Sequence, residues 1–179
     1  MNLSRRKFPL SVQQMTMVAL FMALNIILSR FSLQLGPTNR ISIAFLPNVL
    51  LGFFFGPWIA GIASVGTDLL KSMMFGNYGG FFIGYTFTAF LGGFIYGLFM
   101  HRPVVKWYHI ALAIFFNTLI SNIILGTLWI HIMYQTPILA LLATRVPQNL
   151  IMAPVRFVIA HLVIGLPQLQ SHYKKYRRF

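Results

Sequence analysis

The chain has 179 residues, of which 58% are hydrophobic, and it sets fourteen Lys and Arg against a single acidic residue, for a formal net charge of +13. A soluble domain needs charges of both signs spread over its surface, so this composition excludes an ordinary soluble globular protein. Apolar stretches of membrane-spanning length recur along the chain, and we therefore expect an integral membrane protein.

Six apolar stretches approach or reach the length of about 20 helical residues that a hydrocarbon core requires. The second and third are short and are separated only by Gly56, Pro57 and Trp58. They could form one long buried run, but Gly-Pro is a strong helix breaker, and a tight turn there gives two spans. The sequence therefore predicts one all-α domain, residues 1–179, built as a six-transmembrane-helix bundle with spans at residues 11–29, 41–55, 59–75, 81–100, 108–133 and 146–166.

The distribution of cations predicts the orientation of the bundle. An even number of spans puts both termini on one side of the membrane. Three cations at residues 5–7, four in the basic tail at residues 170–179, and Arg102 and Lys106 in one loop all lie on that side. Positively charged segments favour the cytoplasm, so we expect cytoplasmic N- and C-termini.

The basic N-terminus and the net charge fit membrane orientation better than a signal peptide or nucleic-acid binding. No small-residue cleavage site follows the first cations and further spans follow, so we expect the first span to be retained and not removed as a signal peptide. The cations lie at span ends and not on a polar surface, which favours membrane orientation and contact with anionic lipid over nucleic-acid binding. The absence of Cys excludes disulfides and thiol chemistry.

Five further cations lie where orientation does not require them, at the outer side of the membrane or in the outer part of a span. An ionised side chain at that depth is costly unless it is paired or faces a wet cavity. Asp68, the only acid, can pair with Lys71 three residues along the same helix face, which leaves the others without an acidic partner. For any single Arg, the alternative is that its side chain extends to the membrane–water interface and places its charge in water. As a set they predict an anionic ligand that enters from outside: Arg30, Arg40, Lys71, Arg145 and Arg156.

One face of the sixth span carries polar residues at the spacing i, i+4, i+7 and i+11, namely Arg145, Asn149, Met152 and Arg156, with Gln148 beside them. This stripe combines guanidinium groups, amides that donate and accept, and a polarizable thioether. A polar seam between two helices is the alternative. We interpret the stripe as one wall of a ligand site.

Aromatic residues gather at the predicted outer ends of the third to fifth spans: Tyr78, Phe81, Tyr85 and Trp129. An interfacial aromatic belt explains any one of them, and stacking on a flat ligand is the competing interpretation. The glycines within residues 77–80 favour a loop that can order over a flat ring.

The sequence lacks the groups that catalysis would need. One acid excludes a carboxylate dyad, the five His show no metal-ligand spacing on a common helix face, and no Ser or Thr has a His placed as its base. No Gly-rich loop with Lys-Ser/Thr is present to cradle a phosphate, so we expect no ATP hydrolysis. Binding is the activity that remains, and we expect no catalytic residue, metal or cofactor.

A series of fragments has a specific order and spacing: Leu28-Ser-Arg-Phe-Ser32, Arg40-Ile-Ser-Ile-Ala-Phe-Leu-Pro47, Gly52-Phe-Phe-Phe-Gly-Pro57, Gly80-Phe-Phe-Ile-Gly84, Leu125-Gly-Thr-Leu-Trp129 and Arg145-Val-Pro-Gln-Asn-Leu-Ile-Met-Ala-Pro-Val155. In these the chain resembles the substrate-binding (S) components of energy-coupling factor (ECF) vitamin transporters, and within them the folate S components. Two positions depart from the folate pattern, Arg156 where Gln is frequent and the Asn77-Tyr-Gly-Gly segment.

The resemblance implies a six-helix bundle in the bacterial cell membrane that binds one vitamin at its outer face, under the loops joining helices one–two and three–four. It also implies a transmembrane T subunit as partner, with two cytoplasmic ATPases that hydrolyse the ATP. The family's first helix docks on the T subunit through an Ala-x-x-x-Ala seam, which corresponds to Ala19 and Ala23.

A folate fits both the residues and the resemblance, because it has a pterin edge of donors and acceptors and a glutamate with two carboxylates. Asp68 can accept two hydrogen bonds from the pterin edge, with the Lys71 pair as the alternative. We predict the folate-binding subunit of an ECF importer, with another flat vitamin or a non-transporting lipid-binding membrane protein as alternatives. The candidate ligand residues are Arg30, Arg40, Asp68, Lys71, Tyr78, Phe81, Tyr85, Trp129, Arg145, Gln148, Asn149, Met152 and Arg156.

Overall fold

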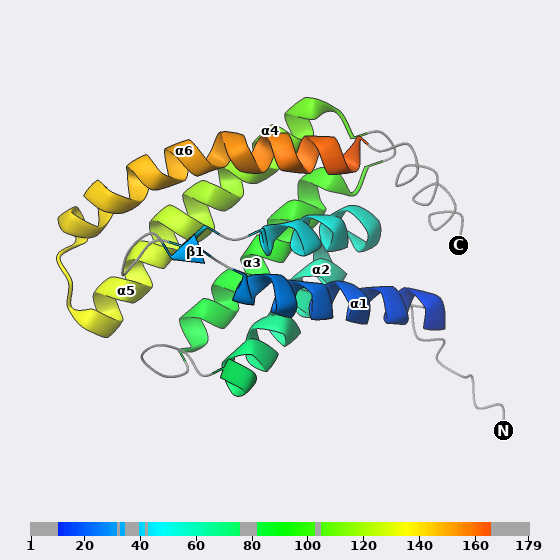
Figure 1. Ribbon diagram of the computed structural model, residues 1–179, viewed down its shortest axis with the longest axis horizontal. Coiled ribbons are helices and arrows are strands. Elements are labelled where there is room, and N and C mark those ends of the chain that lie inside the picture. The colour runs from blue at the N-terminus through cyan, green and yellow to red at the C-terminus, as the bar shows by residue number, and fades with distance from the viewer. Residues whose placement is uncertain are drawn as a thin grey trace, which may run out of the picture.

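The structure, a computed structural model, describes residues 11–31, 33–34, 40–41, 43–75, 82–102 and 105–165. These residues are almost entirely helical: α1 (Val12–Arg30), α2 (Phe45–Phe75), α3 (Ile83–Met100), α4 (Trp107–Asn117), the π-helix η1 (Thr118–Leu125), α5 (Gly126–Tyr134) and α6 (Ile138–Ile164). Between α1 and α2, the short strands β1 (Leu33–Gln34) and β2 (Arg40–Ile41) pair antiparallel. Figure 1 shows the helices as a bundle in which α1 begins and α6 ends at the same end of the molecule.

Five helices in the described part of the chain are long and apolar enough to cross a membrane: α1, α2, α3, the continuous helix Trp107–Tyr134 formed by α4, η1 and α5, and α6. The expected fifth span, residues 108–133, agrees closely with Trp107–Tyr134. The expected start of the second span is wrong, because Arg40 and Ile41 form a strand and the helix begins at Phe45. The sixth span starts earlier than expected, at Ile138.

The predicted break between the second and third spans lies inside α2. Gly56 has a non-helical backbone (φ 80°, ψ −177°), a conformation that glycine adopts without a steric penalty. Pro57 has no N–H, so the Phe53 carbonyl four residues earlier loses its helical donor. His101 replaces that donor, because its Nδ1 lies 3.2 Å from the Phe53 oxygen and a carbonyl can only accept. The end of α3 therefore caps the break in α2.

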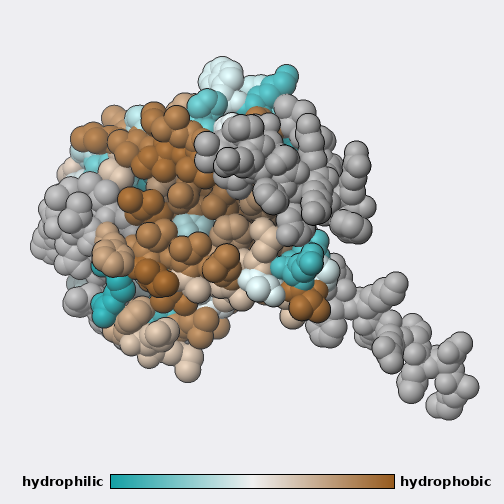
Figure 2. Space-filling view, turned by 45° about the vertical axis from the view of Figure 1, so that its right-hand side comes forward, coloured by the Kyte–Doolittle hydropathy of each residue, from teal (hydrophilic) through white to brown (hydrophobic). Residues whose placement is uncertain are grey.

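The close packing of α2 on α3 depends on small residues. A Cβ built on Gly97 would overlap the backbone of Pro57, and one on Gly52 would lie 2.6 Å from the Gly97 nitrogen. Beside this contact lies the apolar core, formed by α2 together with the ends of α3 and α6 and the start of α4, with Tyr96, Met100 and Ile110 among its buried members. The outside of the bundle is rich in exposed apolar side chains, as Figure 2 shows, which fits lipid as the surrounding solvent.

The first helix packs on α2 along one face and leaves its other faces exposed. It begins with a capping box, in which Gln14 N–H donates to Ser11 Oγ and Ser11 N–H donates to Gln14 Oε1. Of its nineteen residues only Phe21 and Asn25 are buried. The exposed faces of α1 are therefore left for lipid or for another protein.

We predict that Gly97→Ala destabilises the protein by roughly 1–3 kcal/mol, because the added methyl group meets rigid backbone at Pro57 and forces α2 and α3 apart. The midpoint of thermal unfolding of the detergent-purified protein measures the effect. Gly66→Ala is the matched control, since its methyl group would meet only the flexible end of Met22, 2.9 Å away. Equal midpoints for the two variants would contradict this role of Gly97 in the α2–α3 contact.

Candidate functional site

The predicted stripe of α6 faces the inside of the bundle. Asn149 and Met152 are buried, and Arg145, Gln148 and Arg156 are half-buried. The Nε atoms of both arginines are buried and have no hydrogen-bond partner among the described residues. Donors of this kind in a protein interior are rare and mark a place where water or a polar ligand binds. The helical spacing therefore selected residues that do share a buried face.

The Arg145 side chain extends from α6 toward η1 and α3. Its Nη1 donates to the Asn122 carbonyl at 3.2 Å, and its charge interacts with the Tyr85 hydroxyl. Asn149, one turn further along α6, donates from Nδ2 to the Arg145 carbonyl at 2.9 Å. Arg145 thus uses Nη1 in a hydrogen bond within the fold, and its Nε has no partner among the described residues.

Arg156 is placed deeper along α6, against the start of α2. Its guanidinium carbon lies 6.0 Å from the centroid of the Phe45 ring, and its charge also interacts with the buried Tyr96 hydroxyl of α3. A ring face attracts a cation but does not neutralise it. Arg156 is therefore suited to an anionic group that comes from outside the chain.

Asp68 and Lys71 lie near the C-terminal end of α2 and have neutral hydrogen-bond partners. Thr86 Oγ1 donates to Asp68 Oδ2 at 2.9 Å, which ties α3 to α2. Lys71 Nζ donates to Asn25 Oδ1 on α1, and its charge also interacts with that of Asp68. Asp68 keeps lone pairs that the Thr86 bond does not use.

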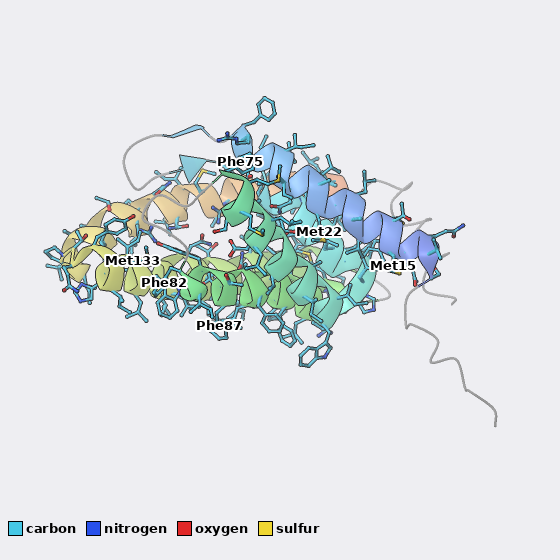
Figure 3. The ribbon with its side chains drawn as sticks, turned by 90° about the horizontal axis from the view of Figure 1, so that it is seen from below. Met15, Met22, Phe75, Phe82, Phe87 and Met133 are labelled. Atoms are coloured by element: carbon cyan, nitrogen blue, oxygen red, sulfur yellow. The ribbon has the colours of Figure 1, made fainter. Side chains whose placement is uncertain are left out.

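An aromatic cluster forms where α3 begins and α5 passes it. The Phe82 ring contacts the rings of Trp129 and Tyr85, with centroids 5.4 Å and 6.0 Å apart. The Trp129 indole N–H donates to Thr88 Oγ1 at 2.9 Å, which fixes the plane of its ring. Figure 3 shows Phe82 and Met133 at one end of the molecule and Met15 at the opposite end. The cluster thus occupies one end of the bundle.

Several predicted site residues are not brought into this arrangement. Arg30 is exposed, and its guanidinium carbon lies 4.1 Å from the centroid of the Phe75 ring. Tyr78 and Phe81 lie outside the described residues, and for Arg40 only the backbone is described. Ala19 and Ala23 are both exposed on α1.

Sequence analysis missed a row of polar side chains inside the continuous helix Trp107–Tyr134. Four buried oxygens there have no hydrogen-bond partner among the described residues, those of Asn117 Oδ1, Thr118 Oγ1, Ser121 Oγ and Thr127 Oγ1. The Asn117 amide donates to the Tyr96 hydroxyl at 2.8 Å. The available signal was the presence of amide and hydroxyl groups within an otherwise apolar span.

Asn25 was missed as well. This residue is only 1% exposed, and its amide nitrogen donates to the Ala44 carbonyl at 2.7 Å and to Asn48 Oδ1 at 2.8 Å. With the bond from Lys71, the Asn25 side chain joins α1 to both ends of α2. Its signal was one amide in the apolar first span.

The described residues contain no group of three or more His, Asp or Glu that could hold a metal ion. What the site offers instead is a buried interior with two partly unpaired guanidinium groups, neutral donors and acceptors, and aromatic rings at one end. Such a set can bind a polar, aromatic anion.

Comparison with known proteins agrees with this chemistry. Residues 13–164 match the family described as the substrate-specific component of ECF transporters, a family of transporter subunits and not of enzymes. A protein named folate transporter FolT from Leuconostoc mesenteroides is 34% identical over 178 residues, covering 94% of this chain and 93% of its own. Its namesake from Clostridium novyi is 32% identical over 150 residues, covering 84% and 87%.

A solved structure, the crystal structure of FolT bound with folic acid, has a similar fold. Its TM-score to this chain is 0.79 at 29% sequence identity, covering 86% of this chain and 93% of that one. The match over residues 13–164, together with relatives more than 30% identical along most of their length, shows that this multi-pass membrane protein belongs to the family of ECF transporter substrate-specific components.

Proposed function

We propose that this chain is the folate-binding subunit of an ECF importer, which captures folate at the outer face of a bacterial cell membrane. The observation that carries the proposal is the pair of buried guanidinium Nε atoms on α6 that have no hydrogen-bond partner among the described residues, in a chain whose relatives are named folate transporters. Asp68, the only acidic residue of the sequence, accepts a hydrogen bond from Thr86, and its charge interacts with that of Lys71. An anionic ligand is therefore the natural counter-ion for Arg145 and Arg156.

A folate supplies groups that match the unpaired atoms of the site. Its carboxylates can accept charge-assisted bonds from the Nε of one of the two arginines, Arg145 or Arg156. Its pterin and amide groups can bond to oxygens of Asn117, Ser121 and Thr127, for which the described part of the chain supplies no partner. The ring contacts of the aromatic cluster around Trp129 suit a flat ligand. In this proposal Asp68 accepts hydrogen bonds from the pterin edge through the lone pairs that the Thr86 bond does not use.

We place both termini in the cytoplasm and divide α2 into two spans at Gly56, which gives six spans in one domain. The positive φ of Gly56, the missing N–H of Pro57 and the cap from His101 support a change of direction there. The common end at which α1 begins and α6 ends supports termini on one side (Figure 1). The basic residues near both termini favour the cytoplasmic side.

The partners in this proposal are a transmembrane T subunit and two ATPases. The ATPases would hydrolyse ATP, and this chain would not. The exposed surface of α1, with Ala19 and Ala23 one turn apart, supports α1 as the docking helix, because small side chains let another helix approach closely. Membrane lipid covers the remaining apolar surface.

We predict that the purified chain binds folate on its own, without ATP, at one site per chain and with submicromolar affinity or tighter. Isothermal titration of ligand-free protein with folic acid and with reduced folates measures this. Heat from another vitamin, with none from any folate, would identify an S component of different specificity. No heat from any vitamin would favour a lipid-binding structural protein.

We predict that Arg156→Ala weakens folate binding by roughly 2–4 kcal/mol, because it removes a buried charge-assisted contact. The same titration gives the value, and the elution volume of the detergent-solubilised variant reports its fold. Arg102→Ala is the control, since Arg102 is an exposed loop cation after α3. Affinity within about twofold of wild type would make Arg156 a structural residue.

We predict that Ala19→Trp or Ala23→Trp prevents co-purification with the T subunit and abolishes folate uptake by the complete transporter. The bulky ring would hold the partner helix away from α1, whereas folate binding by the solitary chain stays near wild type. Leu112→Trp, at an exposed position on α4, serves as the control for a bulky lipid-facing ring. Intact uptake and co-purification in both alanine variants would mean that this face does not meet the partner.

A further inference from the structure

The π-helix η1 interrupts an otherwise α-helical span. It runs for eight residues between α4 and α5, in the interior of the membrane helix Trp107–Tyr134. Such helices are rare, mostly limited to a single turn, and frequently found at functional sites. A π segment of this length is disfavoured against the α form, so contacts from neighbouring elements are needed to stabilise it.

Arg145 of α6 makes such a contact. Its Nη1 donates to the carbonyl of Asn122, a residue inside η1, at 3.2 Å. A bond from a charged donor is stronger than a neutral one, and a low-dielectric interior strengthens it further. Because the acceptor is a backbone carbonyl, this bond depends on the path of the helix and not on the identity of the side chain at position 122.

Gly126 provides the space for this bond. It is the first residue of α5, directly after η1, and a Cβ built there would lie 2.7 Å from Arg145 Nη1 and 3.3 Å from the Ser121 carbonyl oxygen. The guanidinium group therefore lies directly against the backbone at the end of η1. Any side chain at position 126 would displace it.

Trp129 follows Gly126 by three residues, so the path of η1 determines where its indole lies. The indole N–H meets Thr88 Oγ1 at 2.9 Å, and the ring contacts Phe82. In a π-helix each N–H bonds five residues back, and in an α-helix four. Conversion of η1 to the α form would turn α5 about its axis relative to α4 and move Trp129 away from Thr88.

We propose that Arg145 is a positioning residue for the binding site: its Nη1 holds η1 in the π form and thereby fixes Trp129 against α3. Its Nε, which has no partner among the described residues, remains available to the ligand. The inference rests on the proposed function in its last step only, the effect of a displaced Trp129 on folate affinity.

The experiment uses full-length protein in which Trp129 is the only tryptophan, through the exposed-site changes Trp58→Phe and Trp107→Phe, labelled with fluorotryptophan. Fluorine NMR of the ligand-free protein then reports the surroundings of Trp129. We expect Gly126→Ala, which displaces the guanidinium but keeps its charge, and Arg145→Gln to shift the Trp129 resonance in the same direction. Both should weaken folate binding by roughly tenfold to a hundredfold.

Gly66→Ala is the control, because it adds the same methyl group to a membrane helix where only the flexible end of Met22 lies nearby. Its resonance and affinity should equal those of the parent. If Arg145→Gln does not accumulate, Gly126→Ala decides the matter alone.

An unchanged Trp129 resonance in Gly126→Ala and Arg145→Gln would overturn the inference, even with folate binding lost in Arg145→Gln, since Arg145 would then be a ligand contact only. A shifted resonance with parental affinity in Gly126→Ala would overturn the link from Trp129 to binding. The resonance is measured without ligand, so a parent that binds no folate would refute the proposed function and leave the control of Trp129 by Arg145 testable.

Discussion

The scarcity of acidic side chains governs how this bundle is held together. With one carboxylate for fourteen cations, the inward-facing cations must find neutral partners. Arg145 bonds a backbone carbonyl and Lys71 an amide oxygen, whereas Arg156 lies against an aromatic ring. These partners accept a hydrogen bond or attract a cation, but they carry no negative charge. The interior is therefore structurally connected and still electrically unbalanced, and an anionic ligand would correct that imbalance.

The bundle separates its close-packed apolar part from its polar part along the helix axes. The close-packed apolar core lies where the ends of α3 and α6 and the start of α4 meet α2, and the glycine contacts between α2 and α3 reinforce it. The aromatic cluster and Arg145, the first residue of the α6 stripe, lie toward the opposite ends of the same helices. A dense core of this kind resists deformation, so it fixes the helices on which the polar groups depend.

Composition and periodicity predicted what depends on single helices, and failed where the answer depends on contacts between helices. The 3.6-residue period was enough to place Asn149 and Met152 on a buried face. The helical start assigned to residue 41 was wrong because a short apolar run fits a strand as well as a helix. Nothing local marks residues 118–125 as a π-helix, since its support comes from Arg145. The bond from Lys71 to Asn25 joins residues 46 apart, which no spacing rule can foresee.

The small buried surface of α1 has a consequence for how the protein is made. A helix that is apolar and exposes most of its side chains can enter the bilayer as an independent unit. Its docking requires α2, because the described hydrogen-bond partners of Asn25 are Ala44, Asn48 and Lys71. The amide of Asn25 thus sets the register in which α1 docks on α2. In lipid, apolar side chains alone do not favour contact between two helices over contact with lipid.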